Sequence, residues 1–322
     1  MNCDTAKLLE VKNLTKHFVT KNGKTKRIIH AVNGISFEVM RGETFGIVGE
    51  SGCGKTTASR VINRLIEPTG GQVLFDGIDL FSLNKQELKR NRRDIQMIFQ
   101  DPLASLDPRM TVGQTLTEPL TIHGIGDRVS RREKVKNLLE RVGLQPSYYD
   151  QYPHEFSGGQ LQRVGIARAL ILNPKMVICD EPVSALDVSV QSQILNLLTD
   201  LQKKFALTYI FVAHGLNVVK HISTHIGVMY LGKMVEILRS EDLLASPAHP
   251  YTEALLSAVP VPDPTHPPNR IILEGDIPSS AQLPGGCCFH SRCRYCQAVC
   301  KQETPVQRQR GERMVACHFP LT

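Results

Sequence analysis

The pattern of hydrophobic and polar positions predicts strands that alternate with helices along most of the chain. Short apolar runs rich in β-branched residues predict buried strands at 44–48, 95–99, 176–180 and 208–212. Longer polar or amphipathic segments predict helices at 57–66, 84–93, 157–172 and 188–204. Two further apolar runs, 226–230 and 234–238, are expected to be strands at the edge of the sheet. This alternation is typical of an α/β fold built on a parallel sheet.

Two regions depart from the alternation. Near the N-terminus, short strands at 8–11 and 35–39 are expected to flank a Lys- and Gly-rich turn at 20–27. Residues 103–156 are expected to be helical instead, with one helix at 112–120. A capping box that starts at Ser130 is expected to open a second helix, which stops at Gly143. The stretch therefore predicts a helical subdomain inserted into the α/β fold.

The last quarter of the chain has a different composition. A short helix is expected to start at 249–251 and to end at 258, followed by a proline-rich linker and then by a tail that holds six of the nine cysteines. No apolar run approaches the roughly 20 residues that a membrane-spanning helix needs, and no apolar signal segment is expected at the N-terminus. The net charge of +7 comes without interleaved aromatic residues, so solvated basic faces are expected rather than nucleic-acid binding.

A glycine-rich segment between the first buried strand and its helix predicts a phosphate-binding loop. Gly49, Gly52 and Gly54 allow backbone N–H groups to point toward phosphate oxygens. The helix start adds further N–H groups and the positive end of the helix dipole. Lys55 is expected to bind the β- and γ-phosphates, and the Thr56 hydroxyl is expected to bind Mg²⁺.

A second glycine-rich helix start lies at Phe156-Ser157-Gly158-Gly159-Gln160, where Ser157 is the expected N-cap. Two glycines at this point predict a second anion site. The chain therefore either binds two phosphates itself or shares one nucleotide with another subunit.

Polar residues follow several of the predicted strands. Asp180 at a strand end is expected to hold Mg²⁺ through water, and Glu181 is expected to polarise an attacking water. Gln100 leaves another strand toward a metal or a water, and His214 follows a third as a candidate γ-phosphate contact. Phe18 either stacks on an adenine ring or belongs to the core.

These motifs together resemble those of the ATP-binding-cassette ATPases, over residues 8–245 and in the order of that family. The resemblance implies a RecA-like parallel-sheet core with an N-terminal antiparallel β subdomain and an inserted helical subdomain at about 101–165, within an ATPase domain of residues 1–258. It implies catalytic roles for Lys55, Gln100, Glu181 and His214, and Mg²⁺ ligands at Thr56, Gln100 and Asp180. The implied ATP-binding residues are Phe18, Gly49, Glu50, Ser51, Gly52, Cys53, Gly54, Lys55, Thr56, Thr57, Gln100, Ser157, Gly158, Gly159, Gln160, Asp180 and Asp187.

Two positions differ from the usual motifs of this family. Phe156 replaces a leucine at the start of the signature, at an apolar packing position where little is expected to change. Gly215 replaces the aspartate that usually follows the switch histidine, which changes the expected orientation of that loop.

Segments at 249–256, 259–264 and 100–108 resemble the ATPases of oligopeptide, dipeptide and nickel importers. Residues 259–322 are then the proline-rich linker and a small Cys-rich C-terminal extension of that type. The resemblance implies a 4Fe–4S cluster on Cys287, Cys293, Cys300 and Cys317, with Cys288 and Cys296 as additional cysteines. The irregular spacing suits cluster ligation better than a zinc finger, whose ligands come in close pairs. Zinc and free or disulfide-forming thiols remain alternatives.

The family implies an ATPase subunit that hydrolyses ATP at a head-to-tail cassette dimer and drives uptake of peptides, with nickel, opines or another small solute as alternative cargo. The expected partners are a second ATPase subunit of different sequence, two transmembrane permeases and, indirectly, an extracytoplasmic solute-binding protein. The expected location is the cytoplasmic face of the membrane. A soluble cassette protein acting on nucleic acid is disfavoured by the single cassette, and a non-catalytic subunit by the complete set of catalytic side chains.

Overall fold

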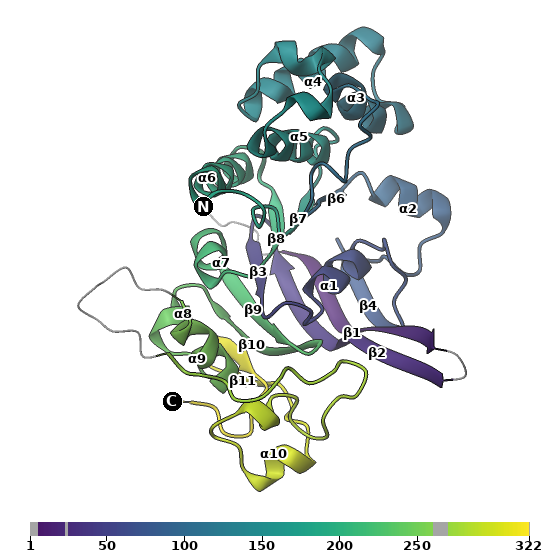
Figure 1. Ribbon diagram of the computed structural model, residues 1–322. Coiled ribbons are helices and arrows are strands. Elements are labelled where there is room, and N and C mark those ends of the chain that lie inside the picture. The colour runs from purple at the N-terminus through teal and green to yellow at the C-terminus, as the bar shows by residue number, and fades with distance from the viewer. Residues whose placement is uncertain (1–5, 23–24, 260–269, 322) are drawn as a thin grey trace, which may run out of the picture. The chain divides into compact units, whose positions relative to one another are not determined.

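The computed structural model describes residues 6–22, 25–259 and 270–321, which divide into two compact units (Figure 1). Unit 1 comprises residues 41–43 and 82–210, and unit 2 comprises the described residues of 6–40, 44–81 and 211–321. Strand β8 (Thr208–Ala213) is divided between the two units after Ile210. The prolines of the expected linker, at positions 260–268, lie outside the described residues.

An antiparallel sheet in unit 2 has the strand order β2-β1-β4-β5. Its strands are β1 (Lys7–Asn22), β2 (Thr25–Met40), β4 (Gly70–Phe75) and β5 (Ile78–Asp79). The prediction of short strands at 8–11 and 35–39 was wrong in length, because β1 and β2 pair along a much longer hairpin. Cross-strand pairs such as Phe18 with Ile29 extend the hydrogen-bonded ladder beyond the predicted strands. The added residues alternate only weakly between polar and apolar side chains, so the sequence pattern did not indicate them.

Five strands of unit 2 are neighbours in one mixed sheet, in the order β3-β9-β10-β12-β11. Strand β3 (Thr44–Val48) runs parallel to β9 (His225–Tyr230), whereas β10 (Lys233–Arg239), β12 (Arg313–Val315) and β11 (Arg308–Arg310) add antiparallel pairs. The prediction that 226–230 and 234–238 are edge strands was wrong, since the tail strand β12 pairs with β10. All five residues of β3 are buried, as expected for a parallel strand inside an α/β core.

Short helices complete unit 2. They are α1 (Lys55–Ile62), α7 (Leu216–Ile222), α8 (Asp242–Ala245), α9 (Pro250–Ser257), the 3₁₀ turn η3 (His290–Arg292) and α10 (Ala298–Gln302). Helix α7 packs on β3, where Gly46 of the strand leaves room for Val219 and Ser223. The phosphate loop is thus the connection from a fully buried strand to α1.

Unit 1 combines parallel strands with most of the longer helices. Strand β6 (Ile95–Ile98) runs parallel to β7 (Met176–Asp180). Its helices are α2 (Lys85–Asn91), α3 (Val112–Ile122), α4 (Arg128–Arg141), α5 (Gly158–Leu170) and α6 (Val188–Phe205), with 3₁₀ turns η1 (Pro146–Asp150) and η2 (Pro153–Glu155). Helices α3, α4 and α5 pack together (Figure 1).

The start of α4 differs from the prediction. The capping box is formed by Asp127 and Ser130, so the helix begins one turn earlier than the box expected at Ser130 and Glu133. The Asp127 side chain accepts a hydrogen bond from the Ser130 backbone N–H at 2.8 Å. Aspartate is among the preferred N-cap residues, so it caps the earlier turn and Ser130 becomes an internal residue of the helix.

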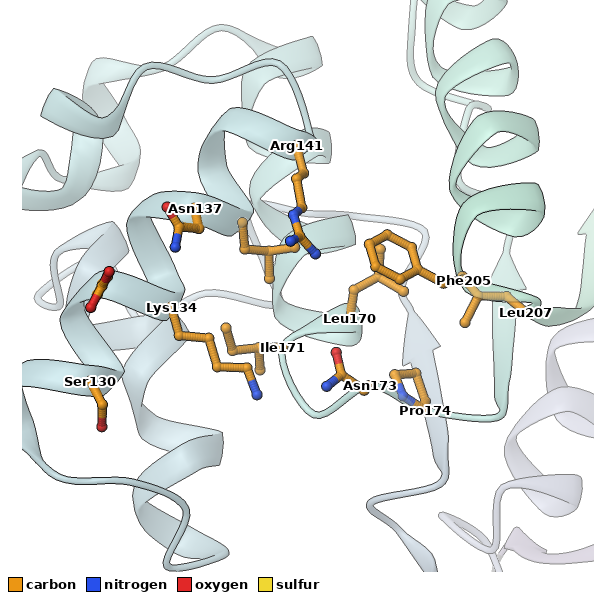
Figure 2. Close-up of a pocket in the computed structure, with 12 residues that line it drawn as sticks. Ser130, Lys134, Asn137, Arg141, Leu170, Ile171, Asn173, Pro174, Phe205 and Leu207 are labelled. Atoms are coloured by element: carbon orange, nitrogen blue, oxygen red, sulfur yellow. The ribbon is translucent and has the colours of Figure 1, made fainter.

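A pocket of about 370 Å³ in unit 1 lies between α4, the turn after α5 and the end of α6 (Figure 2). Arg141 and Lys134 extend into it from α4, and Phe205 forms part of the opposite wall. The Arg141 guanidinium carbon lies 5.4 Å from the centroid of the Phe205 ring. None of the residues predicted for ATP binding or catalysis lines this pocket.

Candidate active site

The predicted phosphate loop connects β3 to α1 in unit 2. Gly54 is the N-cap of α1, with a φ of 106° that an L side chain rarely adopts. A Cβ atom at Gly54 would lie 2.0 Å from the Ala31 carbonyl oxygen, and one at Gly49 would lie 2.1 Å from that of Met229. No side chain caps α1, and a helix N-terminus of this kind is suited to bind an anion. Conformation and close backbone packing therefore both require the glycines of this loop.

Lys55 lies inside the loop and is 3% exposed. Its ammonium group donates hydrogen bonds to the carbonyl oxygens of Gly49 at 2.8 Å and Glu50 at 3.1 Å. The Lys55 Nζ atom is also 3.2 Å from Nδ1 of His214, which follows β8. The structure therefore brings together two side chains that lie 159 residues apart and were each predicted to contact the terminal phosphate.

Glu50 of the loop is held through three different groups. Its backbone N–H donates to the Tyr251 hydroxyl at 2.9 Å, and its carbonyl accepts from Lys55. Its carboxylate accepts two hydrogen bonds from Arg292 of the C-terminal tail, at 2.8 and 3.1 Å. Burial by itself would lower the pKa of Arg292, but its hydrogen bonds to Glu50 and Tyr230 raise this pKa above the ordinary value.

The His249-Pro250-Tyr251 segment positions the tyrosine that meets the loop. The backbone N–H of His249 donates to the buried Glu236 carboxylate at 3.0 Å, and that of Ala248 donates to the same group at 2.9 Å. The His249 side chain caps α9 by accepting from the Tyr251 N–H at 3.0 Å, and Pro250 occupies the first turn of the helix. The His-Pro-Tyr pattern, which in the sequence indicated only a family resemblance, therefore has a structural role, because it positions Tyr251 against the phosphate loop.

Gln100 and Glu181 meet in unit 1. The Gln100 amide donates to the Glu181 carboxylate at 2.8 Å, although the two residues are 81 positions apart. Glu181 is 4% exposed and has a φ of 51°, in the left-handed region that non-glycine residues seldom occupy. The preceding Asp180 is fully buried at the end of β7. Two carboxylates and an amide are therefore arranged around one strand end.

The second glycine-rich segment forms the capped start of α5 in unit 1. The Ser157 hydroxyl accepts from the Gln160 backbone N–H at 3.4 Å, and the Gln160 side chain accepts from the Ser157 N–H at 2.9 Å. Phe156 packs edge-on against Tyr148 at 5.2 Å between ring centroids. This contact shows how a phenylalanine fits where the family usually has leucine.

The other predicted ATP-binding residues lie in different settings. Phe18 is half-buried in the β1–β2 hairpin, with the Lys16 ammonium 4.9 Å from its ring centroid, so it is not a core residue. Gly215 is the N-cap of α7 with an ordinary backbone conformation, and glycine is tolerated there. Asp187 is the exposed N-cap of α6. Burial raises the pKa of the Cys53 thiol, so it adds no negative charge to the phosphate loop.

The tail cysteines divide into two groups. Cys287, Cys293, Cys300 and Cys317 line one small cavity, whereas Cys288 and Cys296 are absent from its lining. The Cys287 backbone N–H donates to the Cys300 carbonyl at 2.8 Å. The other lining residues include His249, His290, His318 and Phe289. Among the described residues, no three or more His, Cys, Asp or Glu side chains converge as they would around a single metal ion.

The sequence patterns did not identify Arg292 or Tyr251 as residues of the site. Tyr251 belongs to the recognised His-Pro-Tyr segment, but nothing in that pattern indicates that its hydroxyl reaches Glu50. Arg292 carried no signal beyond its position just before Cys293. Both contacts join segments more than 200 residues apart, at separations of 201 and 242 positions.

Comparisons with known proteins agree with this geometry. The ABC transporter family model matches residues 32–184, and the model of the oligopeptide/dipeptide transporter C-terminal region matches residues 235–300. The oligopeptide transport ATP-binding protein AppF of Bacillus subtilis is 50% identical over 97% of each chain. The oligopeptide transport ATP-binding protein OppF of Salmonella typhimurium is 50% identical over 96% of this chain and 95% of its own.

A solved structure extends the likeness to the fold. The dimeric post-hydrolysis state of the ATP-binding cassette MJ0796 bound to ADP and Pi has a TM-score of 0.65 and 32% identity, covering 72% of this chain and 98% of that chain. No helix in the described part of the chain is both long and apolar enough to cross a bilayer. The chain has the ATP-binding-cassette fold with mixed α/β sheets and belongs to the ABC transporter family, among the ATP-binding proteins that carry the oligopeptide/dipeptide transporter C-terminal region.

Proposed function

We propose that this chain is the ATP-hydrolysing subunit of an importer that takes up di- and oligopeptides at the cytoplasmic face of a membrane. The observation that carries the hydrolytic part is the buried Lys55 ammonium, placed 3.2 Å from His214 within the phosphate loop. The peptide cargo is supported by the 50% identity to AppF over almost the whole chain. The C-terminal match to oligopeptide/dipeptide transporters supports the same cargo.

Lys55 and the loop N–H groups bind the phosphates in this proposal. The ammonium exchanges its hydrogen bonds to the Gly49 and Glu50 carbonyls for phosphate oxygens, so nucleotide binding replaces contacts that already orient the side chain. The oxygen donors of Thr56, Gln100 and Asp180 fit Mg²⁺, which prefers such ligands. Mg²⁺, when bound, neutralises charge on the β- and γ-phosphates. Phe18 stacks on the adenine ring.

Glu181 orients and polarises the attacking water. The hydrogen bond from Gln100 fixes the direction of its carboxylate, and the fixed backbone at Glu181 limits its other conformations. His214 contacts the γ-phosphate beside Lys55. Because phosphoryl transfer needs positioning and charge stabilisation more than covalent chemistry, these contacts contribute to catalysis by fixing the groups around the γ-phosphate.

Two such cassettes are proposed to close head to tail, so that one ATP is held by the phosphate loop of one subunit and by Ser157, Gly158, Gly159 and Gln160 of the other. The dimeric MJ0796 cassette bound to ADP and Pi supports this arrangement. Asp187 lies beside the same interface in the proposal. The second subunit is a different ATPase chain, and the pair acts on two transmembrane permeases that receive peptide from an extracytoplasmic binding protein.

The Glu181→Gln variant tests the catalytic assignment. In the reconstituted importer, ATP hydrolysis is expected to fall about 10²–10⁴-fold while ATP binding persists, because only the polarising carboxylate is lost. Glu140 on α4 is exposed and distant in sequence from the motifs, so Glu140→Gln serves as the matched control and keeps full hydrolysis. Unchanged hydrolysis in Glu181→Gln refutes the role of Glu181. Absent hydrolysis in the unmodified complex refutes the proposed function.

The four cysteines that line the tail cavity are proposed to hold a 4Fe–4S cluster. Their common cavity and the irregular spacing of the four cysteines support this proposal. The cavity is also lined by three histidines, His249, His290 and His318, and the described side chains do not converge on one point in this structure. Hydrogen bonds from Cys288 and His249 lower the pKa of Cys287, which favours the thiolate needed for ligation. The four cysteines would hold the cluster, which would cross-link segments of the tail.

Metal analysis of anaerobically purified protein tests this part of the proposal. Iron and acid-labile sulfide are expected in near-equal amounts, and Cys300→Ser is expected to lose most of both. Cys296→Ser is the matched control, because Cys296 does not line the cavity, and it retains them. Zinc without sulfide, or equal loss of iron from both variants, contradicts the proposed cluster.

A further inference from the structure

The tail segment between Cys288 and Cys293 reaches the phosphate loop through one side chain. Arg292 ends the 3₁₀ turn η3, and its side chain is 8% exposed. Its two terminal nitrogens each donate to a different oxygen of Glu50, at 2.8 and 3.1 Å. This bidentate arrangement is the most directional form of an arginine–carboxylate pair. The pair is therefore more than a loose surface contact.

Aromatic packing fixes the tail segment that carries this arginine. Phe289, three residues before Arg292, is 1% exposed and packs against Tyr230 and Tyr251 at 5.3 and 5.4 Å between ring centroids. The Arg292 guanidinium lies 6.0 Å from the Tyr230 ring centroid. Tyr251, which packs against Phe289, also accepts the Glu50 backbone N–H. One aromatic cluster thus supports both the arginine and the loop residue that it binds.

The charge of Glu50 gives this contact a consequence for nucleotide binding. A carboxylate in a loop that must accept phosphates opposes the ligand unless a cation neutralises it. Arg292 supplies that cation and, together with Tyr251, restricts the backbone of Glu50, whose carbonyl also accepts from Lys55. The loop is consequently ordered and partly neutralised by residues that lie outside the nucleotide-binding motifs.

We propose that Arg292 is a positioning residue of the nucleotide site, through which the C-terminal tail holds the phosphate loop in its binding-competent form. This inference rests on the proposed ATP-binding function and assigns the tail a role in it. Arg292 acts through Glu50 and does not touch the nucleotide. Since Arg292 directly precedes Cys293, the fold of the cysteine-rich segment determines whether the arginine can reach the loop.

The test compares two arginines of the same tail. Arg294 also pairs with a glutamate, its Nη2 atom lying 2.6 Å from Glu253, but this pair is more exposed and does not involve the loop. The purified chain and its variants are titrated with a fluorescent N-methylanthraniloyl derivative of ATP, and KM and kcat are measured in the reconstituted importer. Arg292→Ala is expected to raise the dissociation constant and KM about tenfold with little change in kcat. Arg294→Ala is expected to leave the dissociation constant and KM unchanged, and Arg292→Lys is expected to recover part of the affinity.

A double substitution separates loop positioning from a general loss of folding. If the unpaired Glu50 carboxylate is what weakens binding, Glu50→Gln combined with Arg292→Ala binds the nucleotide more tightly than Arg292→Ala alone. Equal affinity of Arg292→Ala and Arg294→Ala overturns the inference, and so does a double variant that binds no better than Arg292→Ala. If Arg292→Ala does not fold, Arg292→Lys and Glu50→Gln carry the test, and unchanged affinity in both overturns it. Failure of the unmodified chain to bind the nucleotide refutes the proposed function instead.

Discussion

Two helices of this protein begin at glycine-rich segments, but the physical reason for the presence of glycine differs between them. At the phosphate loop, Gly54 has a positive φ, and a Cβ atom there would meet a backbone carbonyl at 2.0 Å. At the start of α5, Gly158 has an ordinary backbone conformation, and a Cβ atom would lie 3.6 Å from the nearest side chain, that of Leu186. The fold of the chain requires glycine at Gly54 and tolerates alanine at Gly158, whereas a Cβ atom at the neighbouring Gly159 would lie 2.7 Å from Val190.

The two helix starts also differ in their caps. Helix α1 has no side-chain cap, whereas Ser157 and Gln160 form a complete capping box at α5. The phosphate loop therefore depends on backbone packing in its own unit, and α5 has its cap supplied by its own side chains. A glycine that the fold does not need is a candidate for contact with a ligand or a partner. For Gly158, the expected contact is the nucleotide of a partner cassette.

Gly54→Ala is expected to have the largest effect, because it disturbs both the fold and the loop. Strain at the positive φ and the clash with Ala31 are expected to lower the free energy of unfolding by about 2–4 kcal/mol, measured by urea denaturation. Nucleotide binding is lost as well. Gly165→Ala, inside α5 and with no atom within 4 Å of the added Cβ, is the control and is expected to cost nothing. A Gly54→Ala protein that is stable and binds ATP normally would show that the fold does not require glycine at this position.

Gly158→Ala is expected to affect function alone. Its unfolding free energy stays within about 0.5 kcal/mol of the original, because the new methyl group makes an ordinary contact. ATP hydrolysis by the assembled importer nevertheless falls about a hundredfold, as is typical when an anion-binding donor site is blocked. Both quantities are measured on the same preparation. Full activity of this variant would show that the glycine pair does not face a nucleotide.

Ser157→Ala is expected to lower stability modestly. It removes the hydroxyl that accepts the Gln160 N–H, which lowers the free energy of unfolding by about 1 kcal/mol. Ser157→Asn keeps a capping side chain and recovers most of this loss. Thermal unfolding followed by circular dichroism measures both variants. Equal melting temperatures of the alanine variant and the original chain would mean that the cap does not stabilise α5.

Several features of the site were predictable because they depend on neighbours in the sequence. The phosphate loop follows from glycine spacing beside Lys55, and the Ser157 cap follows from a serine placed just before the helix. The buried strand before Asp180 follows from an apolar run. Helix α4 shows the limit of such patterns, because the sequence pattern predicts a cap at Ser130 and the folded chain uses Asp127 instead.

The sequence by itself determined the chemistry-bearing residues and the local elements that carry them, since strand, turn and capping signals act over a few positions. Only the tertiary structure decided which distant residues meet. Four features depend on this tertiary packing: the Gln100–Glu181 contact, the pairing of β12 with β10, the shared cavity of four cysteines and the Arg292–Glu50 pair. The reason is physical: such contacts depend on how separate elements pack, and a pair 242 positions apart leaves no periodic or spacing signal along the chain.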